Sequence, residues 1–159
     1  MRVARGIECA RVEASDDNTR GGFDGLSRWL GLRWEAFDRV RLTIRPEHMN
    51  PAGLLAGGVT YAMVDYCMGS TLWRSRESGE RIATINIAIN YLRTAREGDV
   101  FCTSVLDRRN DRNAILSSRV FAELPDGSER LLATAIGSYS IFPAERLGGF
   151  DQGTSTAED

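Results

Sequence analysis

Histidine and cysteine are scarce in this chain of 159 residues. Because His48 is the sole histidine and no G-x-S-x-G motif is present, neither a Ser-His-Asp nor a Cys-His hydrolase is indicated. Cys9, Cys67 and Cys102 are odd in number and widely spaced, so we expect reduced thiols and no metal site. The chain also lacks a P-loop and a G-x-G-x-x-G motif, which excludes the usual nucleotide-binding signatures. We therefore expect no cofactor.

An excess of positive charge and long apolar runs are absent as well. Lys and Arg total 20 against 22 Asp and Glu, which leaves no general basic field for nucleic acid. No run of about 18 apolar residues occurs, and the N-terminus lacks an apolar signal region, so we expect no membrane segment and a cytoplasmic location. The length suits a single domain at residues 21–143, flanked by flexible segments at 1–20 and 144–159.

The periodicity of apolar residues predicts a helix, a strand, a second helix and four further strands. In chain order, these elements are expected at residues 23–30, 38–45, 58–73, 82–92, 99–107, 114–124 and 131–142. Turn residues such as Glu97-Gly98 and Pro125-Asp126-Gly127 join the later strands, which favours an antiparallel meander over helical crossovers. The second helix is apolar on all sides, as expected for a helix enclosed by a curved sheet.

Two features of the second helix are candidates for chemistry. Gly57 and Gly58 expose backbone N–H groups at its start, where the helix dipole favours a developing oxyanion, although a Gly-Gly pair can also make a simple tight turn. Asp65 is the one charge between Gly57 and Trp73. Its carboxylate either faces a catalytic cavity or has a structural role, paired with an arginine or hydrogen-bonded to a neighbouring hydroxyl. Eight residues separate Gly57 from Asp65, about 12 Å along a helix. If both act on one carbonyl, they must come from different subunits of a symmetric dimer.

The segment from His48 to Gly69, HMNPAGLLAGGVTYAMVDYCMG, resembles the signature of the PaaI-like (phenylacetate-pathway) hotdog thioesterases. The shared pattern includes Asn50, Gly53, the Gly57-Gly58 pair, Asp65 and Gly69. The similarity extends through NIAINYLRTAREGD and the last strand, so it covers residues 23–142. It implies an α+β hotdog fold, in which a curved antiparallel sheet wraps a central helix, and hydrolysis of an acyl-CoA to a free acid and coenzyme A.

The resemblance also implies roles for individual residues. Asp65 would act as general base on water or attack the thioester directly, and the Gly57 N–H of the other subunit would polarise the carbonyl. Asn50 would orient water or substrate, and Thr84 falls where many members place a hydroxyl near the carboxylate. Such an ionised acid opposite oriented amides suits acyl transfer to water.

Substrate contacts are expected on both sides of the reacting carbonyl. Ala56 and Gly58 would border the thioester, and the acyl group would lie against Tyr61, Met68 and Leu72. The phosphates of coenzyme A need cations near the mouth of the site. Four arginines are candidates for that role: Arg93, Arg96, Arg109 and Arg112. The family commonly forms a homotetramer, a dimer of dimers, and the sequence does not select between its two known arrangements.

Ala56 is the main departure from the family, which has a histidine in the corresponding H-G-G motif. Alanine donates no side-chain hydrogen bond, so we expect a weakened or retuned thioesterase. His48 lies eight positions earlier and is expected to make a loop hydrogen bond instead. The alternatives are a non-catalytic acyl-CoA-binding hotdog protein, a hotdog hydratase or dehydratase, and a purely structural domain in which an arginine neutralises Asp65.

Overall fold

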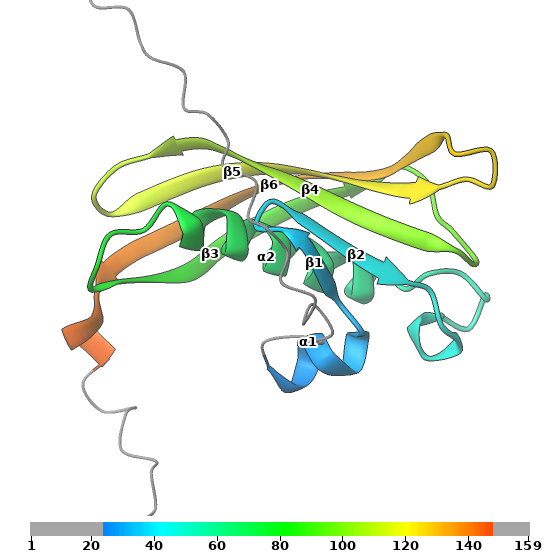
Figure 1. Ribbon diagram of the computed structural model, residues 1–159, viewed down its shortest axis with the longest axis horizontal. Coiled ribbons are helices and arrows are strands. Elements are labelled where there is room, and N and C mark those ends of the chain that lie inside the picture. Colours follow the sequence, from blue (N-terminus) through cyan, green and yellow to red (C-terminus); the bar gives the residue numbers. More distant parts are fainter. Residues whose placement is uncertain (1–23, 148–159) are drawn as a thin grey trace, which may run out of the picture.

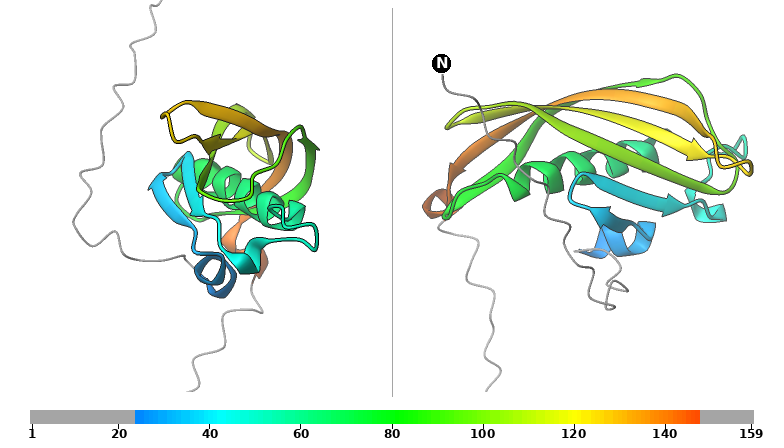
Figure 2. Two further views of the ribbon diagram at one scale, coloured as in Figure 1. Left: turned by 90° about the vertical axis from the view of Figure 1, so that its right-hand side faces the viewer. Right: turned by 45° about the horizontal axis from the view of Figure 1, so that its top comes forward.

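A six-stranded antiparallel sheet curves around one long helix (Figures 1 and 2). The computed structural model describes residues 24–147. Its elements are α1 (Gly25–Leu30), β1 (Arg33–Ala36), β2 (Arg39–Thr43), η1 (Pro46–His48), α2 (Gly57–Arg74), β3 (Glu80–Tyr91), β4 (Asp99–Arg109), β5 (Asn113–Glu123), β6 (Glu129–Pro143) and η2 (Ala144–Leu147). The strand order is β1-β2-β4-β5-β6-β3, and every pairing is antiparallel. The predicted α+β hotdog architecture is confirmed.

The central helix α2 buries one face against the sheet and leaves the other partly open. Seven residues of α2 are buried: Val59, Thr60, Met63, Val64, Cys67, Met68 and Leu72. The opposite face carries Asp65, Gly69, Ser70 and Trp73, none of which is buried. The prediction that protein encloses this helix on most sides is therefore only partly right for the single chain.

The sheet completes the core through the alternation of its strands. In β5, the buried residues Ala114, Leu116, Ser118, Val120 and Ala122 alternate with more exposed ones. The one polar member of this series is satisfied, because the Ser118 hydroxyl lies 2.6 Å from that of Ser104 on β4. This inward row supplies the surface on which α2 packs.

The turns follow the predicted chemistry. Gly127, between β5 and β6, has φ 79°, a left-handed conformation that glycine adopts without steric cost, and Asp126 Oδ1 accepts from the Ser128 N–H at 2.9 Å. The predicted elements are confirmed, with boundaries that move by up to a few residues. Strand β1 was not predicted, because four residues are too few for a periodic signal.

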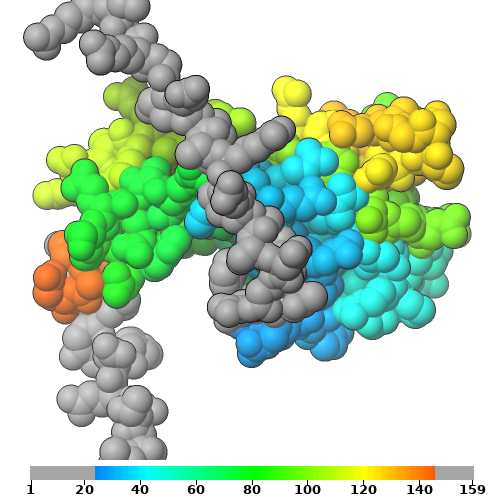
Figure 3. Space-filling view, in the orientation of Figure 1, coloured from blue at the N-terminus to red at the C-terminus, as the bar shows by residue number. Residues whose placement is uncertain are grey.

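The ends of the domain are partly outside the described residues. The segment 1–20, expected to be flexible, lies outside them, as does the tail beyond residue 147. Residues Ala144–Leu147 form the 3-10 helix η2, which lies beside the loop between α2 and β3 (Figure 3). There, the Ala144 N–H donates to the Gly79 carbonyl at 2.8 Å. Within residues 24–147, no helix has both the length and the apolar composition that a membrane crossing requires.

Candidate active site

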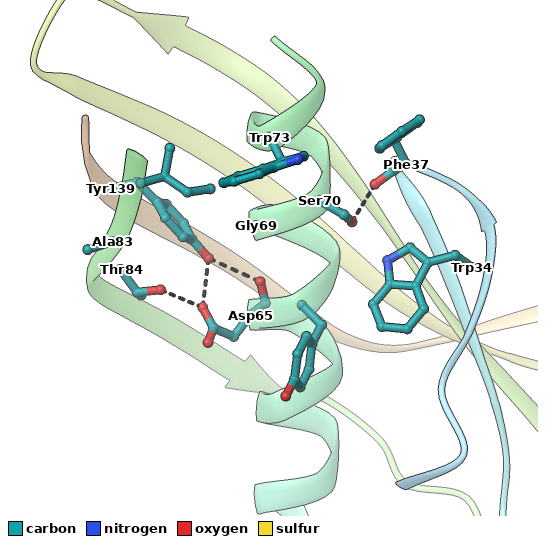
Figure 4. A pocket seen from close by; sticks show the side chains of 11 residues that line it. Trp34, Phe37, Asp65, Gly69, Ser70, Trp73, Ala83, Thr84 and Tyr139 are labelled. Carbon is teal, nitrogen blue, oxygen red and sulfur yellow. Dashed lines mark hydrogen bonds between the residues drawn. The ribbon is translucent and has the colours of Figure 1, made fainter. Parts of the chain in front are cut away.

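Asp65 lies beside an apolar groove that α2 forms with the edge strands β1 and β3 (Figure 4). The groove has a volume of about 490 Å³. Its walls come from β1, the β1–β2 turn, α2, β3 and β6: Trp34, Phe37, Asp65, Tyr66, Gly69, Ser70, Trp73, Ile82, Ala83, Thr84 and Tyr139. Most of these side chains are aromatic or small, so the groove can hold a bulky apolar group next to a carboxylate.

Two hydroxyl groups hold the same oxygen of the Asp65 carboxylate. Thr84 Oγ1 on β3 and the Tyr139 hydroxyl on β6 each donate to Asp65 Oδ1 at 2.8 Å (Figure 4). No arginine pairs with Asp65 anywhere in residues 24–147. Asp65 therefore has the hydroxyl partners that a structural role also allows, but it lines a groove and has no arginine pair. Thr84 lies beside Asp65 as the family resemblance implies.

The start of α2 forms a second, separate cavity of about 190 Å³. Asn50, Gly57, Tyr91 and Arg93 are among its lining residues. The N–H groups of Gly57 and Gly58 form no hydrogen bond within residues 24–147, because the first intrahelical bonds run from Val59 and Thr60 to the Ala56 carbonyl. Free amides at a helix start can receive an oxyanion. Asp65 does not line this cavity. In a single chain, the Asp65 carboxylate therefore borders the groove, whereas Gly57 borders the separate cavity at the start of α2.

Asn50 has a structural task in addition to its predicted one. Its Oδ1 accepts from the N–H groups of Ala52 and Leu54, at 3.0 and 3.2 Å, and so shapes the loop that leads into α2. The side-chain amide nitrogen makes no hydrogen bond in the described part of the chain, and Asn50 lines the same cavity as Gly57. Asn50 therefore retains a donor that a ligand can use.

Two of the expected acyl contacts are wrong. Met68 and Leu72 are fully buried, since they belong to the face of α2 that packs on the sheet. Tyr61 is 38% exposed but does not line the groove. The sequence could not separate the two faces because α2 is apolar all round, and the groove residue Trp73 was missed for the same reason. The groove residues on other elements, Trp34, Phe37 and Tyr139, were not predicted either.

The candidate arginines differ in how free their side chains are. Arg109 is committed to Glu80, which accepts at 2.6 Å, and to the Ser75 carbonyl, so its prediction as a phosphate ligand is not supported. Arg93 borders the cavity with Asn50 and Gly57, and Arg96 borders a neighbouring one. Arg112 lies in the β4–β5 turn, at the opposite end of the sheet from Arg93.

His48 makes the loop contacts that were expected of it. The ring is fully buried, and Nδ1 accepts from the Arg45 N–H at 3.1 Å. Burial, followed by the charge of Arg45, lowers the pKa of His48. It lines neither of the two cavities that hold Asp65 and Gly57.

Comparisons with known proteins agree with this fold. The family model described as the thioesterase superfamily matches residues 52–125. A candidate esterase of Pseudomonas aeruginosa is 28% identical over 103 residues, which are 64% of this chain and 73% of that protein. A candidate esterase of Saccharolobus solfataricus is 22% identical over 121 residues, or 74% and 77% of the two chains.

Solved structures show the same fold at low sequence identity. A Bacillus halodurans protein crystallised with CoA is 20% identical, with a TM-score of 0.67 over 74% of this chain and 75% of that one. A thioesterase of Haemophilus influenzae is also 20% identical, with a TM-score of 0.67 over 77% and 85% of the two chains. The fold is thus that of the hotdog thioesterases. With the match to the thioesterase superfamily model over residues 52–125, the enzyme class of the chain is thioester hydrolase.

Proposed function

We propose that this protein is an acyl-CoA thioesterase of the PaaI-like type, acting as a homodimer in which each site combines groups from both subunits. One observation carries the proposal: Asp65 borders an apolar groove, and two hydroxyls hold Oδ1 while Oδ2 accepts no hydrogen bond within residues 24–147. Such a carboxylate is placed to accept a proton from water or to attack a thioester carbonyl.

The acyl group would occupy the groove over α2. Gly69 is central to this assignment, because a Cβ atom there would meet no other atom within 4 Å and would project into open space. Trp34 and Trp73 supply large apolar walls on either side. These residues replace Met68 and Leu72 as the proposed acyl contacts. The CoA-bound relative from Bacillus halodurans supports coenzyme A as the carrier.

The dimer would form through the edge strand β3. This 12-residue strand pairs only with β6 among the described strands, and Ile85 on it is 60% exposed. Long exposed edge strands of this kind are ready to pair with another chain. Thr84 marks the Asp65 end of β3, and Tyr91 marks the Gly57 end. An antiparallel pair of β3 strands with its two-fold axis between Ile87 and Ala88 would place Thr84 opposite the partner's Tyr91.

This register would assemble the separated half-sites. The Asp65 carboxylate of one subunit would face the Gly57 N–H, the Asn50 amide and the Arg93 side chain supplied by the other subunit. Arg112, at the Asp65 end of its own sheet, would then approach the same composite site as the second subunit's Arg93. In this arrangement, Gly57 stabilises the oxyanion, Asn50 orients water or the carbonyl, and the arginines meet the phosphates.

Further association into a tetramer fits the outer face of the sheet. Val105 and Ile136 are 60% and 55% exposed there, and both align with Ser117 across the central strands. A face of apolar and small polar residues suits the packing of one dimer on another. We propose this face for the dimer-of-dimers contact.

Thiol release from a panel of short, medium and aromatic acyl-CoAs tests the function. Wild-type protein should turn over at least one member, and Asp65→Asn should lose about a hundredfold or more in kcat, the size typical of a general base. The specific alternative is a non-catalytic acyl-CoA-binding protein, which the absence of the motif histidine at Ala56 favours. If neither wild type nor Asp65→Asn releases thiol while both still bind acyl-CoA, that alternative is correct.

A further inference from the structure

The phenol of Tyr139 is buried directly against the proposed catalytic carboxylate. Its side chain is 1% exposed, and its hydroxyl donates to Asp65 Oδ1 at 2.8 Å and lies 3.3 Å from the Asp65 backbone carbonyl. Burial, then the nearby charge of Asp65 and the hydrogen bond to it, raises the pKa of Tyr139 far above its ordinary value. The hydroxyl therefore remains a protonated donor at every pH at which a thioesterase works.

Two rigid strands hold the two donors on one carboxylate oxygen. Tyr139 belongs to β6 and Thr84 to β3, and the register pairs these two residues directly. Gly137, two residues before Tyr139 on the same face of β6, brings the strand close to α2. The terminal torsion of an aspartate is broad and roughly two-fold, so without such contacts its two oxygens exchange places readily. Here they are inequivalent.

We infer that Tyr139 is a positioning residue that acts with Thr84 to make Oδ2 the reacting oxygen of Asp65. This inference rests on the proposed role of Asp65 as base or nucleophile. Oδ2 then takes the proton from a water molecule whose oxygen bonds to the acyl carbon, or Oδ2 itself forms the bond to that carbon. In either route the C–S bond breaks and the coenzyme A thiolate leaves. In both cases Oδ1 keeps its two hydrogen bonds throughout.

The inference predicts a pH effect that a merely structural role would not produce. Hydrogen bonds to a carboxylate favour its charged form. Within residues 24–147, the titratable groups around Asp65 and the Tyr139 hydroxyl are Tyr139 from β6 with Tyr61 and Tyr66 from α2, and no basic side chain pairs with Asp65 to compensate for a lost donor. Without the Tyr139 hydroxyl, the acid limb of the kcat/KM profile should therefore move to higher pH.

The test compares Tyr139→Phe with wild type, Asp65→Asn and a control, Ser118→Ala. Tyr139→Phe keeps the ring and removes one charge-assisted hydrogen bond, so kcat should fall about tenfold while KM changes less than about threefold. Ser118→Ala also removes a buried hydrogen bond between hydroxyl groups, the one to Ser104, and neither serine lines either cavity. It should lower the melting temperature without moving the pH profile. Incorporation of 3-fluorotyrosine at position 139 provides a variant that keeps the hydroxyl.

The fluorinated phenol is a stronger donor, so its acid limb should move to lower pH, opposite to that of Tyr139→Phe. Opposite shifts of this kind, with an unmoved profile for Ser118→Ala, support the positioning role. Should Tyr139→Phe fail to fold, the fluorotyrosine shift alone decides. If Asp65→Asn is inactive while neither change at Tyr139 moves the profile, the inference about Tyr139 is wrong and the proposed function stands. If Asp65→Asn retains wild-type turnover, the proposed function itself fails.

Discussion

The hydroxyl of Tyr91, on the edge strand, donates a 2.9 Å hydrogen bond to the carbonyl oxygen of Gly57 at the start of α2. The ring also lies 3.4 Å from the position that a Cβ of Gly57 would take. This contact ties the first turn of the helix to β3 and leaves the Gly57 N–H free. The helix start is thus fixed in place while its amide remains available to a ligand.

Removing that amide should therefore abolish turnover without unfolding the helix. Proline suits the first helical position, and Ala56, with φ −65° and ψ 137°, already has the extended conformation that a following proline requires. Gly57→Pro should lower kcat about a hundredfold, as loss of one oxyanion donor does. Gly57→Ala adds the same Cβ against Tyr91 but keeps the N–H, so it should lose far less. Equal losses in steady-state thiol release would mean that contact with Tyr91, and not the amide, is responsible.

Mixing two inactive variants tests whether each site spans two subunits. Co-assembly of Asp65→Asn with Gly57→Pro gives mixed dimers in which one site has an intact Asp65 and an intact Gly57 amide from opposite subunits. Random pairing should restore about one quarter of wild-type activity, since half of the dimers carry one complete site of two. Measurement needs co-expression with two tags and thiol release, beside each variant alone. A site built within one chain would show no recovery.

Introducing a histidine at position 56 tests how its absence from the H-G-G position affects turnover. Ala56 begins α2 without a side-chain cap, beside the free amides of Gly57 and Gly58. An imidazole there can donate to the thioester carbonyl, so Ala56→His should raise kcat about tenfold on the best substrate. Ala56→Phe, of similar size but without a donor, is the control. A gain in both variants would indicate a packing effect, and a loss in Ala56→His would show that the site is adapted to alanine.

The parts of this molecule that follow local rules were predictable from the sequence. Residues 114–124 combine apolar and β-branched residues between turn signals, so the strand β5 could be predicted in advance, while its alternating burial is a finding of the structure. Asp65 and Thr84, 19 positions apart, were placed together only through the family pattern. Tyr139 was not predicted, because it occupies an inward position of an apolar strand and its polar partner is 74 positions away. The groove was missed because all-round apolarity hid which face of α2 meets the sheet.

Gly137 should be intolerant of any side chain. A Cβ atom at this position would lie 2.6 Å from Met68 Sδ and 3.3 Å from the Tyr139 ring. Gly137→Ala should therefore lower the free energy of unfolding by about 1–3 kcal/mol, the usual cost of overpacking a core. Gly25→Ala is the control, because a Cβ there meets nothing within 4 Å. Urea denaturation of both variants measures the difference, and equal stabilities would mean that Met68 moves aside freely.

His48, the sole histidine, should make the free energy of unfolding depend on pH near neutrality. Its pKa is lowered in the folded chain, first by burial and then by Arg45, so the unfolded chain binds the proton more tightly. The stabilisation is complete above the unfolded pKa of about 6.5, and it is lost as the pH falls from there toward the lower folded value. The free energy of unfolding of wild type, measured with urea, should decrease as the pH is lowered from about 7.5 to about 5. His48→Asn, which cannot titrate, should be less stable at pH 7.5 but should lack most of this slope. A wild-type slope that persists in His48→Asn would assign the effect to other groups.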